Sequence, residues 1–250
     1  MKKIYFPFLL FLILLSCKDP NYQNTKIVGK TSVIDSTTVS DSTYIKVIEP
    51  YKEKMIKEIN TVLTYTTKDL VRTDGNMQST LGNLMADLTY TRANPLFKKE
   101  TGKDIDFALL NYGGIRSGIF TGAVTNRNAF QLMPFENTLV VVELTAEKVQ
   151  ELVNYFTEGS RAHPLSKQIQ LTISENGHAL IKIRDMIFDK SKTYYVLTSD
   201  YLQSGGDRMD FFKDPVHLYK LDYKVRDAII DYFKSVDTLR STLDNRVILK

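Results

Sequence analysis

Apolar side chains three and four positions apart, the spacing of a helix that buries one face, occur in four segments of the chain. The first three segments follow Pro50, Ser79 or Thr80, and Thr145, in that order. The fourth begins at Val225. Pro50 suits a helix start, because its missing N–H would have no helical partner there. Ser79 or Thr80, and Thr145, can each cap a helix by accepting a hydrogen bond from a backbone N–H of the first turn. The apolar positions of the four predicted helices are Met55, Ile56 and Ile59; Leu81, Leu84, Met85 and Leu88; Val149, Leu152, Val153 and Phe156; and Val225, Ala228, Ile229 and Tyr232.

Short apolar runs bounded by turn residues predict six strands. They cover residues 62–65, 105–110, 138–144, 169–173, 180–183 and 194–199. Asn176 and Gly177 separate two of these runs, and this dipeptide supplies the positive φ angles of a tight hairpin turn. Helices and strands do not alternate strictly along the chain. We therefore predict an α+β fold, with a mixed β-sheet and packed helices, as a single domain.

Two long loops combine polar residues, glycines and an aromatic residue. The first covers residues 111–138, beginning with NYGGIR and ending with MPFENT, and lies between the predicted strands 105–110 and 138–144. The second covers residues 199–207 and reads SDYLQSGGD. Loops of this composition at the ends of strands favour a binding site over a plain connection.

The N-terminus reads MKKIYFPFLLFLILLSC, in which two lysines precede an apolar segment over residues 4–15. This segment is too short for a membrane-spanning helix and is typical of a secretory signal. The last four residues, Leu-Leu-Ser-Cys, resemble the lipobox of bacterial lipoproteins, in which the cysteine becomes the lipid-bearing N-terminus. Cys17 is the only cysteine of the chain, so no disulfide or thiolate metal site competes for it. The alternative is an ordinary signal peptide with an incidental cysteine.

These features predict a signal peptide over 1–16, a polar tether over 17–44 and one folded domain over 45–250. A lipid on Cys17 would anchor the domain to a membrane of the cell envelope, at the outer membrane or the cell surface. The net charge is only +4 and the basic residues are scattered, so we do not expect nucleic-acid binding.

Known catalytic signatures are missing from the sequence. The three histidines, at positions 163, 178 and 217, lie in different segments without the spacing of metal ligands, so we expect no metal site in this chain. His163 precedes a proline and His178 follows the Asn-Gly turn, and both are expected to be solvent-exposed loop residues. Nucleophile-elbow, Walker and dinucleotide-binding glycine motifs are also missing, so we assign no catalytic residue.

The motif 111–116, NYGGIR, has the chemistry of a ligand-binding turn. The Asn111 amide offers a donor and an acceptor to the edge of a heterocycle. Gly113 and Gly114 allow close approach of the backbone to a ligand, or a positive φ. Arg116 presents a planar fork suited to phosphate oxygens. The alternative is a strand followed by a glycine turn, with Arg116 merely on the surface.

Aromatic and acidic residues complete the set. Phe135 packs into the core or forms one wall of a slot for a base, and Tyr201 is the candidate for the opposite wall. Two aromatic faces around a planar ring contribute about 1–3 kcal/mol per stack. Asp207, after Gly205 and Gly206, is placed to accept hydrogen bonds from vicinal hydroxyls, as acidic residues do with ribose. Together these groups describe a nucleotide or nucleoside site.

Four ordered motifs, (S/T)-x-x-GNL, NxGGIR, PF-x-NT and (F/Y)-L-x-x-GGD, resemble the C-terminal domain of 5′-nucleotidases over roughly residues 45–250. The resemblance implies the α+β fold of that domain. It also implies Phe135 and Tyr201 as the base sandwich, Asn111 at the base, Arg116 at the phosphate and Asp207 at the ribose. In that family a separate N-terminal metallophosphoesterase domain holds two metals, and hinge rotation carries the substrate to them.

The sequence departs from the family pattern at several positions. The metallophosphoesterase motifs are not found, so two divalent metals are expected on a separate metallophosphoesterase partner. A phosphate-binding arginine is usual four residues before the Ser79 position, where this chain has Gly75. Arg72, Arg127 and Arg208 are candidates to replace it. Arg208 and Met209 follow the GGD motif in place of the usual glycine and aromatic residue, and Tyr201 replaces a commoner phenylalanine.

Three functions remain open from the sequence. The chain is the nucleotide-binding half of a 5′-nucleotidase-type phosphohydrolase in nucleotide catabolism, active only with its metal-bearing partner. Alternatively it is a lipoprotein that binds nucleosides or nucleotides without chemistry, or a structural envelope lipoprotein that has lost its ligand.

Overall fold

The computed structural model describes residues 23–159 and 161–250, and the chain divides into two units between Ile48 and Glu49. The predicted signal peptide and Cys17 lie outside the described residues. Residues 23–41 contain no helix or strand. In the described part of the chain, no helix combines the length and apolarity needed to cross a membrane. The compact unit Glu49–Lys250 falls within the predicted domain 45–250.

Helix α2 (Ser42–Ile59), the first in the described residues, begins well before its predicted start after Pro50. Asp41 caps it, because its Oδ1 accepts a hydrogen bond of 2.8 Å from the backbone N–H of Thr43. Pro50 therefore lies inside the helix, and the prediction that it starts the helix was wrong. The exposed chain tolerates this proline because water can reach the carbonyl that loses its partner.

The central sheet has four strands in the order β2-β8-β4-β9. Its members are β2 (Phe107–Ala108), β8 (Thr193–Ser199), β4 (Thr138–Thr145) and β9 (His217–Lys224). β2 runs parallel to β8, and β4 is antiparallel to both of its neighbours, so the sheet is mixed as predicted. The predicted strand 105–110 is shortened to β2, because the N–H of Leu110 leaves the sheet to bond Pro164 O at 2.9 Å.

Two smaller sheets flank the central one. The first, in the order β10-β1-β3, contains β10 (Thr238–Leu239), β1 (Val62–Thr66) and β3 (Gly122–Thr125). The second, in the order β11-β5-β6-β7, contains β11 (Val247–Leu249), β5 (Ile169–Ile173), β6 (Ala179–Ile183) and β7 (Met186–Ile187). The predicted β5–β6 hairpin is present, but of its Asn-Gly dipeptide only Gly177 has a positive φ, of +81°, so the turn is not the one with positive φ at both residues.

The other three predicted helices begin where the sequence predicts. The Ser79 hydroxyl accepts a 3.0 Å hydrogen bond from the N–H of Gly82 and caps α3 (Thr80–Thr101). Thr145 caps α5 (Ala146–Glu158) in the same way, and α7 (Val225–Lys234) begins at the predicted Val225. Two shorter helices, α4 (Asn126–Leu132) and α6 (Asp200–Gln203), were not predicted.

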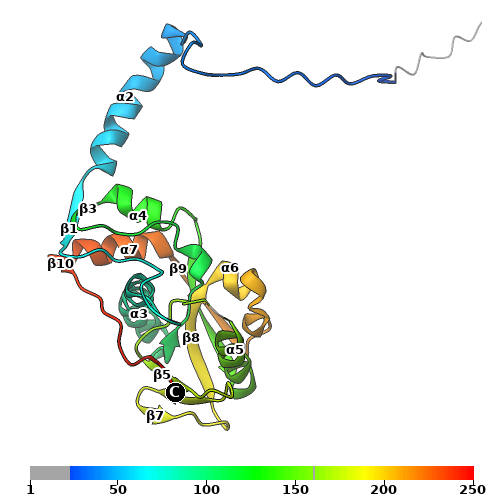
Figure 1. Cartoon of the computed structure of the whole chain (residues 1–250), viewed down its shortest axis with the longest axis vertical. Coiled ribbons are helices and arrows are strands. Elements are labelled where there is room, and N and C mark those ends of the chain that lie inside the picture. The colour runs from blue at the N-terminus through cyan, green and yellow to red at the C-terminus, as the bar shows by residue number, and fades with distance from the viewer. Residues whose placement is uncertain (1–22, 160) are drawn as a thin grey trace, which may run out of the picture. The chain divides into compact units, whose positions relative to one another are not determined.

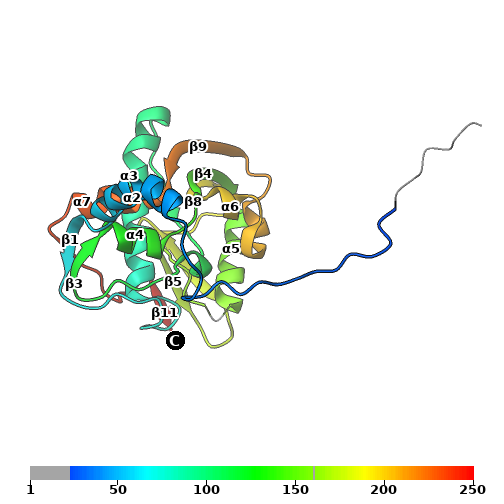
Figure 2. The same cartoon turned by 90° about the horizontal axis from the view of Figure 1, so that it is seen from above.

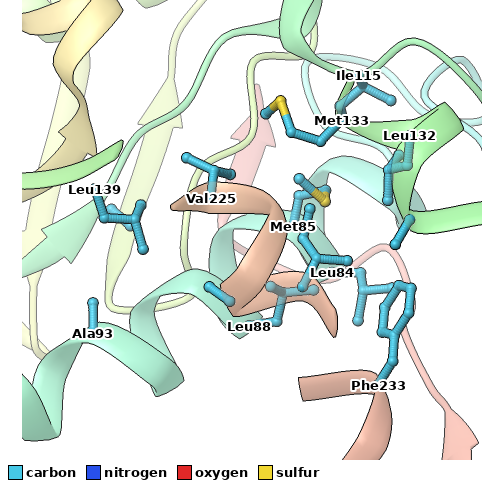
Figure 3. Packing of buried hydrophobic residues seen from close by; sticks show 14 of the residues in the cluster. Leu84, Met85, Leu88, Ala93, Ile115, Leu132, Met133, Leu139, Val225 and Phe233 are labelled. Atoms are coloured by element: carbon cyan, nitrogen blue, oxygen red, sulfur yellow. The ribbon is translucent and has the colours of Figure 1, made fainter. Parts of the chain in front are cut away.

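Two hydrophobic cores cover opposite faces of the central sheet. In Figures 1 and 2, α3 and α7 lie on one side of β8 and α5 lies on the other. Val141 of β4 belongs to the first core, and its neighbour Val142 belongs to the second, as side-chain alternation along a strand requires. Figure 3 shows the first core, where Leu84, Leu88 and Phe233 from α3 and α7 face one another. Each such fully buried side chain stabilises the fold by about 1.5–3 kcal/mol.

Candidate functional site

Strand pairing brings the two predicted loops to one edge of the central sheet. β4 begins at the end of the first loop, β8 ends where the second loop begins, and Leu139 of β4 pairs with Ser199 of β8. β2 runs parallel to β8 and ends at the same edge, so Asn111 emerges beside the other two segments. The register of three strands therefore joins chain segments that are far apart in the sequence.

A cavity of about 270 Å³ lies between the two loops, and we call it the Phe135–Tyr201 pocket. Seven of the nine predicted binding residues line it. They are Asn111, Gly113, Gly114, Arg116, Phe135, Tyr201 and Asp207. Gly205 and Gly206 lie in the wall of an adjoining cavity that shares Tyr201 and Asp207 with it. The expectation that the two loops face a common space is thus matched by the geometry.

Three of the pocket residues are joined through the Asp207 carboxylate. Its Oδ2 accepts a 2.7 Å hydrogen bond from Asn111 Nδ2, and its Oδ1 accepts one of 3.0 Å from the Tyr201 hydroxyl. The Asp207 backbone carbonyl accepts a further hydrogen bond from the Tyr155 hydroxyl, at 3.0 Å. The Asp207 carboxylate thus links the first loop to the second and lies at the pocket wall with its oxygens already paired.

The side chains of Phe135 and Tyr201 lie at the protein surface, where they line the pocket, and are not part of the core. Phe135 is 41% exposed and Tyr201 is 44% exposed, so the alternative that Phe135 packs into the core is wrong. The guanidinium carbon of Arg116 lies 5.8 Å from the Phe135 ring centroid, and Arg116 itself is exposed. Both rings can therefore contact a ligand that enters from solvent.

Two glycines make room for pocket side chains. A Cβ on Gly206 would lie 2.5 Å from ring atoms of Tyr201, and one on Gly114 would lie 2.7 Å from Asn111 Oδ1. Of the four glycines at the site, only Gly205 has a positive φ, at +94°. Gly113 and Gly114 therefore do not adopt the positive φ that the sequence left open, and Gly114 serves to let the Asn111 side chain pack closely.

Asp200 fixes the separation of the two aromatic walls, and sequence reasoning missed it. Its carboxylate accepts hydrogen bonds from Asn137 Nδ2 at 3.1 Å, from the Thr138 hydroxyl at 2.9 Å and from the N–H of Tyr201 at 2.7 Å. Burial raises the pKa of Asp200, but the hydrogen bonds from Asn137 and Thr138 outweigh it, so the net pKa is lowered. One anionic side chain thus ties the segment that follows Phe135 to the helix that carries Tyr201.

His163 differs from its prediction, because it is only 6% exposed. Its Nδ1 accepts a 3.2 Å hydrogen bond from the N–H of Tyr112, and its ring lies against Tyr155 and Phe156. Burial lowers the pKa of His163 to about 4, so the imidazole is neutral at physiological pH. His163 stabilises the NYGGIR turn from the buried side, through its hydrogen bond with Tyr112. His178, by contrast, is exposed as predicted.

The three candidate replacements for an arginine at position 75 lie in different places. Arg72 contacts the NYGGIR turn directly, Arg127 hydrogen-bonds Asn60 Oδ1 at 2.9 Å, and Arg208 borders the cavity that adjoins Tyr201. A Cβ on Gly75 would lie 2.5 Å from the carbonyl oxygen of Gln78. A larger side chain at position 75 therefore requires the local backbone to move.

Metal-ligating side chains are scattered over the fold. Within residues 23–159 and 161–250, no group of three or more His, Cys, Asp or Glu side chains is arranged to hold a metal ion. The described side chains therefore do not fit the two-metal centre that the resemblance places in the neighbouring domain of the family.

Comparison with known proteins agrees with the fold and the motifs. A family model described as 5′-nucleotidase, C-terminal domain, matches residues 61–214. The trifunctional nucleotide phosphoesterase protein YfkN of Bacillus subtilis is 27% identical over 234 residues, a match that covers 86% of this chain and 15% of that protein. The 5′-nucleotidase of Vibrio vulnificus is 26% identical over 194 residues, covering 74% of this chain and 33% of that protein.

Among solved structures, the 5′-nucleotidase precursor from Thermus thermophilus has the same fold, with a TM-score of 0.67 and 21% identity over 82% of this chain and 42% of that chain. This chain therefore spans less than half the length of each of these three proteins. The family match covers more than half of the present sequence. The chain belongs to the 5′-nucleotidase C-terminal domain family.

Proposed function

We propose that this domain binds a nucleoside or nucleotide in the Phe135–Tyr201 pocket, as the substrate-binding half of a 5′-nucleotidase-type phosphohydrolase. The observation that carries the proposal is the convergence of two exposed aromatic rings with the Asn111 amide, the Asp207 carboxylate and the Arg116 guanidinium on one cavity. Each group matches one part of a nucleotide: the faces of the base, the edge of the base, the ribose hydroxyls and the phosphate.

Binding is tested by calorimetric titration of AMP, adenosine and UDP-glucose into the chain lacking its signal segment. Phe135→Ala and Tyr201→Ala each remove one ring, and we expect each to weaken binding by about 1–3 kcal/mol. Phe120→Ala is the matched control, because Phe120 is an exposed phenylalanine (60%) away from the pocket. Equal affinity of all three variants and the parent protein would show that the rings do not hold the base.

The phosphate-releasing chemistry is assigned to a separate metallophosphoesterase chain that supplies two divalent metals. Support comes from the family match over residues 61–214, which is to the C-terminal domain of 5′-nucleotidases. No step of bond cleavage is assigned to a side chain of this protein. We expect the purified chain to release no phosphate from AMP in the presence of divalent metal, and to support release when the partner is added. Metal-dependent release of phosphate by this chain alone would contradict the assignment of the hydrolysis to a separate chain.

A nucleotide-binding lipoprotein without any hydrolytic partner is the second candidate, and the glycine at position 75 favours it. Gly75 has no side chain to offer a ligand, and its crowded surroundings leave little room for one. Tight binding of adenosine, with little gain from the phosphate of AMP, is the outcome that separates this function from the first. A structural envelope protein without a ligand would bind none of the three compounds.

Membrane anchoring through a lipid on Cys17 in the cell envelope is part of the proposal. The lipobox-like sequence Leu-Leu-Ser-Cys supports it. We expect Cys17→Ser to move the protein from the membrane fraction to the soluble fraction of lysed cells. Retention of the variant in the membrane fraction would contradict a lipid on this cysteine.

A further inference from the structure

The backbone that carries Phe135 is a short irregular segment between two regular elements. Residues 133–137 join the end of α4 to the start of β4 and belong to no helix or strand. Met133, at the start of this segment, is buried in the first core (Figure 3), whereas the three residues after it are exposed. Phe135 is a member of neither core. The position of its ring therefore depends on how the backbone beneath it is fixed.

One side chain, that of Arg226 in the first turn of α7, binds this segment at three points. Its Nη1 donates hydrogen bonds to the carbonyl oxygens of Met133 at 3.3 Å and Phe135 at 3.2 Å. Its Nη2 donates to the carboxylate of Glu136. The rigid fork of an arginine fixes these acceptors relative to one another, whereas a lysine ammonium is a single point charge on a flexible stem.

The two residues before Arg226 hold the same segment. Lys224 Nζ lies 2.6 Å from Glu136 Oε2, and the N–H of Val225 donates a 2.9 Å hydrogen bond to the carbonyl oxygen of Asn137. The hydrogen bonds from Lys224 and Arg226 lower the pKa of Glu136 to about 2, so its carboxylate is charged at neutral pH. The start of α7 thus contacts the segment on both sides of the aromatic residue.

Arg226 is buried, with only 7% of its surface exposed. Its guanidinium carbon lies 4.4 Å from the centroid of the Phe130 ring, and its Nε has no hydrogen-bond partner within the described residues. Burial of a charged group with an unpaired N–H costs stability, and an apolar side chain of similar volume often serves the fold as well. Stability alone therefore does not account for an arginine at this position, whereas the fixing of two carbonyl groups beside Phe135 does.

We propose that Arg226 is a positioning residue of the nucleotide site, which fixes the backbone around Phe135 and so determines where this aromatic wall stands. Arg226 does not line the Phe135–Tyr201 pocket, so its effect on a ligand passes through the Phe135 ring. The inference rests on the proposed function, since it concerns how the same base is held.

The test is a double-mutant cycle with adenosine, titrated by calorimetry into the chain lacking its signal segment. Arg226→Met removes the hydrogen-bond donors and keeps an unbranched apolar stem next to Phe130. We expect it to weaken adenosine binding about fivefold in the parent protein, which is no more than the loss caused by Phe135→Ala. In the Phe135→Ala background the same change should alter the affinity by less than about twofold, because no ring remains to be positioned.

Arg246→Met is the matched control. Arg246 is 3% exposed, forms ion pairs with Asp87 and Asp244, and does not line the pocket. Loss of this second buried arginine should change adenosine affinity by the same factor in the parent protein and in the Phe135→Ala background. Arg226→Lys keeps the charge and should recover part of the affinity that Arg226→Met loses. It also replaces Arg226→Met in the cycle if circular dichroism shows that the methionine variant does not fold.

Unchanged adenosine affinity of the folded Arg226 variant, or an equal loss with and without the Phe135 ring, would overturn the inference. Equal coupling of Arg226 and Arg246 to Phe135 would overturn it as well, because it would indicate a general loss of stability. Failure of the parent protein to bind adenosine, or of Phe135→Ala to weaken binding, would instead refute the proposed function, so the two failures are distinguishable.

Discussion

Removing a single oxygen from the pocket wall, by Tyr201→Phe, should strengthen the binding of a ribonucleoside. The Tyr201 hydroxyl donates a 3.0 Å hydrogen bond to Asp207 Oδ1, and Asn111 Nδ2 occupies Oδ2 at 2.7 Å. The hydrogen bond to Asp207, with burial as a second cause, raises the pKa of Tyr201 above its ordinary value. A ribose diol that donates to Asp207 therefore has to share an oxygen with one of these partners or displace it. Phenylalanine keeps the ring and leaves Oδ1 free.

The expected gain in binding free energy follows from the solvent exposure of the hydrogen bond between Tyr201 and Asp207. A hydrogen bond to a charged acceptor stabilises by about 1.5–3 kcal/mol when it is shielded from water. Tyr201 is 44% exposed, so water replaces much of what the variant loses. We expect a gain of about 0.5–1 kcal/mol for adenosine, which is about two- to fivefold in Kd. Tyr201→Ala should instead weaken binding by about 1–3 kcal/mol, because it removes the stacking face as well.

Calorimetry with adenosine and 2′,3′-dideoxyadenosine checks the reasoning. Only adenosine carries the hydroxyl groups that compete for Asp207, so Tyr201→Phe should tighten adenosine and leave the dideoxy compound unchanged. If Tyr201→Phe weakens adenosine as much as Tyr201→Ala does, the hydroxyl contacts the ligand directly. If both compounds tighten equally, the freed oxygen of Asp207 does not meet the ribose. Either result would refute the competition described above.

Three further predictions concern the support of the site. The folded-state pKa of His163, about 4, lies below the ordinary value of 6.5, so its stabilisation is complete above pH 6.5 and is lost as the pH falls toward 4. Urea unfolding of the parent protein should thus show a loss of about 2 kcal/mol between pH 7.5 and pH 5 from this group, and His163→Gln should flatten that part of the pH profile. Asp200→Asn should lower the free energy of unfolding by about 1–2 kcal/mol and weaken AMP binding, since an amide cannot accept all three of its hydrogen bonds; unchanged AMP affinity would contradict a positioning role. Gly206→Ala should weaken adenosine binding severalfold in titration, because the new Cβ would push the Tyr201 ring off its present position; full affinity would show that the ring position is unimportant.

The starts of α3 and α5 and the buried strands could be predicted from local sequence, from a capping residue in the first case and an apolar run in the second. Ser79 and Thr145 each satisfy a backbone N–H of the helix that follows, and the apolar runs of β4 and β5 match the faces that are buried. The strand β9 was missed, although Tyr219, Leu221 and Tyr223 alternate with polar residues along it and pack, half-buried, against the first core. Pro50 misled the prediction of α2, since Asp41 earlier in the chain supplies a better cap.

The residues of the candidate site could be predicted from the sequence, but the hydrogen bonds that hold them in place could not. The motifs indicate which side chains belong together, and the pairing of β4, β8 and β2 explains why they meet. The roles of Asp200 and His163 depend on contacts between segments far apart in the sequence, which no local pattern encodes. His163 shows this most clearly, because a histidine before a proline has the local signature of an exposed loop.

Hydrogen exchange measured by mass spectrometry, with and without AMP, tests most directly whether the two loops hold one ligand. The account predicts slower exchange on AMP addition in peptides covering 111–116, 133–138 and 199–207, with no change in the β5–β6 hairpin, which lies away from the pocket. Protection confined to one loop, or found only outside both, would contradict a nucleotide bound between Phe135 and Tyr201.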